Sequence, residues 1–158
     1  MAIEIERKFL VTGDGWRGQG TTTRFRQGFL STDKDRVVRV RIAGEKGTLA
    51  IKGRNRGAAR PEFEYEIPLS DAQSLLDTLC MPPILEKNRT VIPQGEVFWE
   101  VDEFFGDNQG LIVAEVELPH EDHPVDLPDW VGQEVTHDRR YANSNLVNYP
   151  YSKWNQSE

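Results

Sequence analysis

Residues 3–9 read Ile3-Glu4-Ile5-Glu6-Arg7-Lys8-Phe9, and this stretch alternates between apolar and charged side chains. In a β-strand, successive side chains point to opposite faces of the sheet. Glu4, Glu6 and Lys8 therefore share one face, and Ile3, Ile5 and Phe9 share the other. The alternation continues to Val11 and predicts a strand over residues 3–11 with one charged face.

Strand-like segments recur along the chain, and turn sequences such as Gly44-Glu45-Lys46-Gly47 separate them. The predicted strands cover residues 3–11, 23–31, 37–42, 48–54, 62–67, 85–92, 97–104 and 111–118. Eight strands are enough to close a barrel. We therefore expect an α+β fold that is mainly β, built as an eight-stranded antiparallel closed barrel.

Two helices interrupt the strands. One is predicted over residues 71–80, with Ser70 as its cap and Gln73 completing a capping box. The other is predicted over 137–147, with Thr136 as its cap. Residues 119–128 predict a loop rich in Pro and Asp, and residues 149–158 predict a frayed tail. The chain is thus expected to be a single domain over residues 1–147 with a tail over 148–158.

Composition excludes several functions. The 158 residues include 19 Lys and Arg and 26 Asp and Glu, for a formal net charge of −7. This surplus argues against a nucleic-acid binder and against attraction to anionic membranes. A single cysteine, Cys80, excludes an internal disulfide. The start of the chain lacks the features of a signal peptide and no apolar run approaches 18 residues, which predicts a soluble cytoplasmic protein.

The charged strand faces allow two interpretations. In an ordinary sheet the polar face is wet. However, acidic and basic residues are segregated by strand, the bases are mostly Arg, and only two helices are predicted to cover the apolar faces. Arg suits bidentate contact with phosphate or carboxylate. These features favour a closed barrel with a charged lumen.

Such a lumen would bring two chemistries together. The acidic pairs Glu4/Glu6 and Glu115/Glu117 offer oxygen ligands for hard cations such as Mg²⁺ or Mn²⁺. Basic pairs would bind a polyanion, and together with metal they predict phosphoryl transfer. These basic pairs are Arg39/Arg41, Lys52/Arg54 and Lys87/Arg89.

The motif Glu4-x-Glu6-x-Lys8 resembles the N-terminal signature of the CYTH proteins, the triphosphate tunnel metalloenzymes. Further segments resemble that family's strands and C-terminal helix in the same order, over about residues 1–147. They are Gln27-Gly28-Phe29-Leu30, Arg39-Val40-Arg41, residues 48–52, residues 60–66, Glu86-Lys87-x-Arg89, Glu100-x-Asp102, Ala114-Glu115-Val116-Glu117 and residues 134–146.

The resemblance implies a tunnel that holds a triphosphate with two Mg²⁺ or Mn²⁺ ions, and a C-terminal helix that plugs one end. The implied metal ligands are Glu4, Glu6, Glu62, Glu64, Asp102, Glu115 and Glu117. The implied substrate-binding residues are Lys8, Arg39, Arg41, Lys52, Arg54, Lys87, Arg89 and Arg140. Of these two groups, Glu4, Glu6, Lys8, Arg41, Lys52 and Lys87 are the expected catalytic residues. Glu62, Glu64, Glu66, Glu100 and Asp102 would either bind the second metal or orient the arginines.

The predicted activity is metal-dependent hydrolysis of a triphosphate by an activated water. Inorganic tripolyphosphate is the favoured substrate, with pyrophosphate and phosphate as products, because the short chain leaves little for a nucleoside or thiamine pocket. A class IV adenylate cyclase, a thiamine triphosphatase and a non-catalytic module that binds polyphosphate or nucleotides remain alternatives. The apolar outer strand faces also predict a homodimer.

Overall fold

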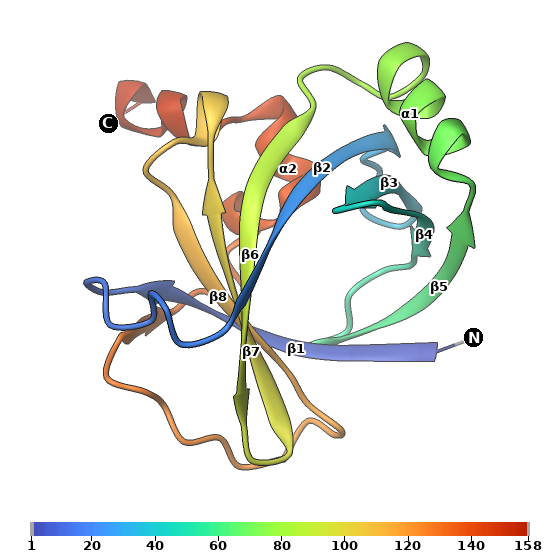
Figure 1. The fold of residues 1–158 in the computed structure, drawn as a ribbon. Helices are drawn as coiled ribbons and strands as arrows, with labels where there is room; N and C mark the ends of the chain where they lie inside the picture. Colours follow the sequence, from blue (N-terminus) through green and yellow to red (C-terminus); the bar gives the residue numbers. More distant parts are fainter. Residues whose placement is uncertain (1, 158) are drawn as a thin grey trace.

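The computed structural model describes residues 2–157, and eight antiparallel strands close on themselves in it (Figure 1). The strands pair in the order β5-β4-β3-β2-β6-β7-β8-β1, and β1 pairs again with β5, so that Glu4 lies opposite Arg60. The predicted closed barrel is confirmed. Its strands are β1 Ala2–Val11, β2 Thr21–Ser31, β3 Val37–Ala43, β4 Lys46–Lys52, β5 Ala59–Ile67, β6 Leu85–Gln94, β7 Val97–Phe104 and β8 Ile112–Glu117.

The charged strand faces point into the barrel. On β1 and β8, Glu6 lies opposite Glu117 and Lys8 lies opposite Glu115, and all four side chains line one internal cavity. The interpretation as a sheet with a wet outer charged face is therefore wrong. The apolar faces point outward and need covering, since exposed apolar area is unfavourable.

Loops provide much of that covering. Trp16, from the β1–β2 connection, and Trp130 pack with Phe9, Trp99 and Val116 over the outer face of β1, β7 and β8. The Trp130 ring meets Trp99 edge-on at 5.6 Å between centroids. A ninth strand, β9 Val131–Glu134, follows and pairs with β1. No sequence pattern predicted this short strand.

Helix α1, Leu69–Thr78, covers β3 and β4, where Ala72 and Leu76 pack on Val40 and Ile42. The helix begins at Leu69 after Pro68, and its N-terminus has no side-chain cap. The predicted Ser70–Gln73 capping box is therefore wrong, because Ser70 already lies inside the first turn.

The other end of the barrel is filled by apolar side chains. Phe29, Leu85, Phe104 and Val113 pack there against Leu146 and its neighbours from the C-terminal region. Helix α2, Asn143–Asn148, lies in this opening, as expected for a plug (Figure 1). The lumen is thus charged along one part of its length and closed by a hydrophobic core along the other.

The predicted continuous helix over 137–147 is wrong. A 3-10 turn, η2 Arg139–Tyr141, precedes α2, and Ala142 is extended between them. Asp138 caps η2 by accepting a hydrogen bond from the Arg140 backbone N–H. Thr136 does not cap a helix; its hydroxyl instead donates to Glu134.

Residues 149–154 of the tail are folded against the barrel, so the predicted fraying is wrong for this segment. A 3-10 helix, η3 Tyr151–Ser157, places Trp154 in the hydrophobic cluster of the plug, edge-on to Tyr141 at 4.9 Å between ring centroids. A third 3-10 turn, η1 Gly106–Asn108, joins β7 to β8. Within residues 2–157, no helix has the length and apolarity needed to cross a membrane.

Candidate active site

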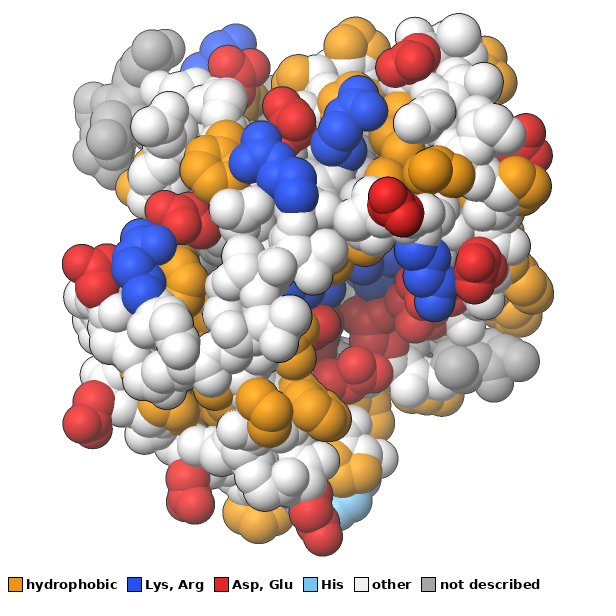
Figure 2. Space-filling model, viewed as in Figure 1, with side chains coloured by type: hydrophobic (Ala, Val, Ile, Leu, Met, Phe, Trp, Pro, Cys, Tyr) orange, Lys and Arg blue, Asp and Glu red, His pale blue; other side chains and the backbone are white. Residues whose placement is uncertain are grey.

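A cavity of about 580 Å³ occupies the charged part of the barrel. Figure 2 shows its mouth as a hollow in which acidic and basic side chains meet. Among the described residues, ten Lys or Arg and seven Asp or Glu line it, a formal excess of three positive charges. In a chain of net charge −7, this local excess marks an anion site. The basic residues are Lys8, Lys34, Arg39, Arg41, Lys52, Arg54, Arg60, Lys87, Arg89 and Arg139.

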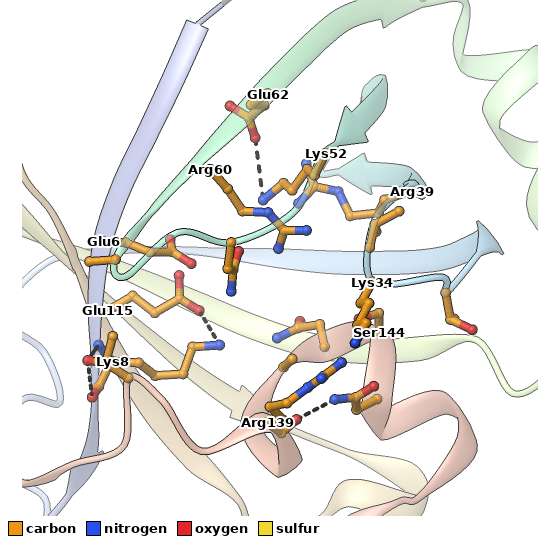
Figure 3. A pocket seen from close by; sticks show the side chains of 18 of the residues that line it. Glu6, Lys8, Lys34, Arg39, Lys52, Arg60, Glu62, Glu115, Arg139 and Ser144 are labelled. Carbon is orange, nitrogen blue, oxygen red and sulfur yellow. Dashed lines mark hydrogen bonds and ion pairs between the residues drawn. The ribbon is translucent and has the colours of Figure 1, made fainter.

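One side of the barrel is an acidic wall, formed by the neighbouring strands β1, β5 and β8. Lys52 Nζ lies 3.0 Å from a Glu4 oxygen. It also lies 3.4 Å from Glu62, and Lys8 Nζ lies 3.5 Å from Glu115 (Figure 3). Two lysines thus form ion pairs with a group of carboxylates that outnumbers them. The acidic wall consists of Glu6, Glu62, Glu115 and Glu117 at the cavity surface and the buried Glu4 behind them.

The carboxylates of the acidic wall are crowded. Burial and the nearby charges of Glu115 and Glu4 raise the pKa of Glu6 well above its usual value. Burial and a hydrogen bond with Glu4 raise the pKa of Glu62 to about 7. Burial opposes ionisation of Glu4, but Lys52 holds its pKa well below the usual range. Without a metal ion, Glu6 and Glu62 therefore retain protons more readily than ordinary carboxylates do. A bound cation would favour the ionised form of both.

The opposite side is a basic wall, formed by Arg39 and Arg41 on β3 and by Lys87 and Arg89 on β6. Burial lowers the pKa of Lys87 to about 7, and the charges of Arg89 and Arg41 act in the same direction against Asp102. Burial and the neighbouring Arg39 and Arg89 also lower the pKa of Arg41 well below its usual value. Cations held this close together favour a bound anion.

The four cations of the basic wall differ in their partners. Arg89 makes three bonds, Nε and Nη2 to Asp102 at 2.8 and 2.9 Å and Nη1 to Glu100 at 3.2 Å. Lys87 Nζ lies 2.7 Å from the same Asp102. Arg41, by contrast, forms no ion pair with any described residue, and its guanidinium stacks on Phe25 at 4.7 Å.

Arg39 also has a donor to spare. One of its terminal nitrogens binds Glu64 at 3.0 Å, but its buried Nε has no hydrogen-bond partner among residues 2–157. A buried donor without an acceptor costs about 1–3 kcal/mol. Arg39 and Arg41 both line the cavity, so their side chains are placed to bind oxygen acceptors that enter it.

Most predicted site residues meet at this cavity, although not all do. Glu4 and Asp102 are buried behind it, beneath Lys52 and Lys87 respectively. Glu66 lies outside the cavity, with Lys46 at 3.8 Å. Arg140 does not reach the cavity either, because its guanidinium binds Asp138 at 2.7 Å and stacks on Trp154. The predicted residues that line it are Glu6, Lys8, Arg39, Arg41, Lys52, Arg54, Glu62, Glu64, Lys87, Arg89, Glu100, Glu115 and Glu117.

The structure adds cavity residues that the sequence had not indicated as ligands. Arg60 points into the cavity and binds the Gly53 carbonyl through Nε and Nη2 (Figure 3). It lies two residues before Glu62, so strand alternation could have found it. Lys34 lies in the β2–β3 connection and Arg139 in the short 3-10 turn η2, where no strand periodicity exists to reveal their direction.

The acidic wall suits a hard divalent cation. Its donor atoms are carboxylate oxygens, the ligands that Mg²⁺ and Mn²⁺ prefer. Among the described residues, no three His, Cys, Asp or Glu side chains already converge as a preformed metal site. The carboxylates bind lysines and share protons instead, and a cation would replace those partners.

The fold and the cavity define a class of protein, a closed antiparallel barrel that binds a polyanion between an acidic and a basic wall. The model of the CYTH domain matches residues 2–146, and the chain belongs to the CYTH family. It is 47% identical to a protein of Acetivibrio thermocellus named "Inorganic triphosphatase", over 99% of this chain and 100% of the relative. A Nitrosomonas europaea protein of the same name is 35% identical, over 91% and 96%.

A solved structure agrees with these relatives. The crystal structure of the inorganic triphosphatase NE1496 superposes with a TM-score of 0.65 at 31% identity, covering 91% of this chain and 97% of that chain. The fold and the family resemblance predicted from the sequence are both confirmed.

Proposed function

We propose that this protein is an inorganic triphosphatase that hydrolyses tripolyphosphate to pyrophosphate and phosphate. The observation that carries the proposal is the pairing of an acidic wall with a basic wall on which, among residues 2–157, Arg41 forms no ion pair and Arg39 Nε has no hydrogen-bond partner. Both curated relatives carry the name of this activity. The predicted class, a triphosphatase of the CYTH type, is confirmed by these matches.

The basic wall binds the substrate. Arg39 and Arg41 donate hydrogen bonds to non-bridging phosphate oxygens, and charge-assisted bonds of this kind are stronger than neutral ones. Lys8 and Lys52 stand at the boundary with the acidic wall and contact both carboxylates and substrate. Arg54 and Arg139, at the more exposed part of the cavity, complete the contacts to the polyanion.

The acidic wall holds the metal. CYTH triphosphatases generally depend on a metal, and Glu4, Glu6, Glu62, Glu115 and Glu117 would hold Mg²⁺ or Mn²⁺ here. When bound, the cation neutralises phosphate charge and makes water a better nucleophile. Asp102 has a different role, because its oxygens already bind Lys87 and Arg89. It keeps those two cations in place behind the substrate.

The lining favours an inorganic substrate over a nucleotide. Among the described residues around the cavity, the aromatic rings are Phe29 and His137, and neither Trp nor Tyr is present. Phe29 itself belongs to the hydrophobic cluster of the plug. A base would therefore find little surface on which to stack, whereas a polyphosphate finds charge along its whole length.

The test is a panel of substrates and metals with two readouts. Purified protein with Mg²⁺ or Mn²⁺ should release phosphate from tripolyphosphate, and the double variant Glu4→Gln, Glu6→Gln should not. With ATP, cyclic AMP and pyrophosphate would identify a cyclase instead. No turnover above the double variant with any metal would overturn the proposal.

A further inference from the structure

Two amide side chains, Gln27 and Asn143, connect the plug to the basic wall. The Asn143 Oδ1 accepts a hydrogen bond from Lys87 Nζ at 2.8 Å and another from Gln27 Nε2 at 2.6 Å. The Gln27 Oε1 in turn accepts from Arg41 Nε at 3.0 Å. Two amides thus link two cations that come from different strands, β3 and β6.

The relay has a fixed direction. A lysine ammonium and an arginine guanidinium only donate, so each must face an amide oxygen. If Asn143 were rotated, its NH₂ would face Lys87; if Gln27 were rotated, its NH₂ would face Arg41. The chain Arg41, Gln27, Asn143, Lys87 therefore has one satisfied arrangement, which fixes both amides.

The position of the Gln27 side chain is fixed by burial and by close packing of its strand. Its side chain is fully buried inside the barrel, at 0% exposure. Its neighbour Gly28 faces outward, where a Cβ would lie 2.8 Å from Cys80 and 2.9 Å from Ile84. The strand is held closely from outside, so Gln27 is held at a defined depth in the lumen.

Arg41 depends on this relay more than its neighbours do. Arg89 is oriented by Asp102 and Glu100, and Arg39 is oriented by Glu64. For Arg41, the bond to Gln27 is its one hydrogen bond to a described side chain, and its remaining support is the ring of Phe25. Without the bond to Gln27, repulsion from Arg39 and Arg89 would turn the Arg41 guanidinium away from them.

We propose that Gln27 and Asn143 are positioning residues that orient Arg41 and Lys87 for the substrate, which makes the plug helix part of the substrate site. The inference rests on the proposed triphosphatase function. Asn143 belongs to α2 and also lines the cavity, so the helix that closes the barrel also reaches the cations.

The test uses near-isosteric variants of the full chain, Gln27→Met and Asn143→Leu, with tripolyphosphate and the metal that supports turnover. Each variant should lower kcat/KM by about 10- to 100-fold, the usual effect of misplacing a binding group. KM should rise, because the cations bind the substrate poorly. A purely structural defect lowers the active fraction, and hence the apparent kcat, without changing KM.

The double variant identifies the relay itself. Residues that act as one unit are not additive, so Gln27→Met, Asn143→Leu should be about as impaired as the worse single variant. Multiplied losses would mean that the two residues act independently and would overturn the relay. Asn148→Ala is the matched control, since this exposed amide on the same helix binds Thr32 outside the relay.

The outcomes separate the two proposals. A wild-type protein that turns over no triphosphate contradicts the proposed function. A wild-type protein that is active, with both variants folded and at wild-type KM, contradicts only the relay. If Gln27→Met fails to fold by circular dichroism, Asn143→Leu still decides the question, because Asn143 lies at the cavity surface and is only half-buried.

Discussion

The acidic and basic walls of the cavity face each other, and their buried charges are compensated differently. β2, at the centre of the basic wall, is four strands from β1 in either direction around the barrel. The acidic wall has more carboxylates than cations and retains protons, as the raised pKa of Glu6 shows. The basic wall has cations in excess, and Arg41 forms no ion pair with any carboxylate in the described part of the chain.

This contrast explains why neither wall could serve alone. Buried like charges destabilise one another, and a bound ligand of opposite charge would reduce the repulsion within each wall. A cation on the acidic wall and a polyanion on the basic wall neutralise both. The predictions below separate the two walls, from the largest expected effect to the smallest.

Removing a charge from the acidic wall should have the largest effect. Glu6→Gln keeps the shape of the side chain but removes the negative charge that a metal requires. We expect phosphate release from tripolyphosphate to fall by about 1,000-fold, the upper range for loss of one electrostatic group. The matched control is Glu66→Gln, on the same strand face as Glu62 but outside the cavity. Equal activity in both variants would contradict the assignment.

Removing a charge from the basic wall should separate binding from stability. Arg41→Ala should lower kcat/KM by about 100-fold, yet leave the melting temperature unchanged or higher, because Arg41 is crowded by Arg39 and Arg89. Arg89→Ala should instead destabilise the fold by about 3–5 kcal/mol, since it leaves a buried carboxylate with one cation fewer. Steady-state kinetics and denaturant unfolding measure the two effects. An unfolded Arg41→Ala protein by circular dichroism would count against its role in the cavity.

Acidic-wall protonation predicts how the stability of the metal-free protein depends on pH. The pKa of Glu62 is raised from 4.5 to about 7 by burial and by Glu4. The folded state thus binds the proton more tightly, and the stability from this group is complete below pH 4.5 and is lost as pH rises to 7. In Glu62→Gln, the melting temperature should therefore depend less on pH between pH 4.5 and about 7. An unchanged pH profile would show that Glu62 titrates normally.

The smallest effect concerns two adjacent arginines near the plug. Arg139 lines the cavity, whereas Arg140 binds Asp138 and stacks on Trp154. Arg139→Ala should raise KM for tripolyphosphate by about two- to fivefold, as expected for an exposed ionic contact. Arg140→Ala should leave KM unchanged. The reverse result would restore Arg140 as the residue that contacts substrate.

Strand alternation explains how much of the site could be predicted from sequence. A period of two fixes which face a side chain shares, so Glu4, Glu6 and Lys8 could be placed together from residue spacing alone. Alternation does not fix depth, however. Glu66 shares a strand face with Glu62 and still lies outside the cavity, and Asp102 lies behind it rather than at its surface.

The C-terminal region shows where sequence reasoning failed. Asp138 caps a 3-10 turn and Ala142 is extended, so the predicted helix is broken and Arg139 faces the cavity in place of Arg140. The same break lets Asn143 reach Lys87. Tertiary packing around Trp154 decides this geometry, and helix periodicity does not report it. The domain boundary at residue 147, the cytoplasmic location, the homodimer and the choice between Mg²⁺ and Mn²⁺ stay predictions.

Binding of Mn²⁺, measured by electron paramagnetic resonance without substrate, tests the division of labour between the walls most directly. Wild type and Arg41→Ala should bind Mn²⁺ with equal affinity, and Glu6→Gln should bind it at least about tenfold more weakly, which corresponds to about 1.4 kcal/mol. Full Mn²⁺ affinity in Glu6→Gln, or its loss in Arg41→Ala, would show that the metal does not belong to the acidic wall.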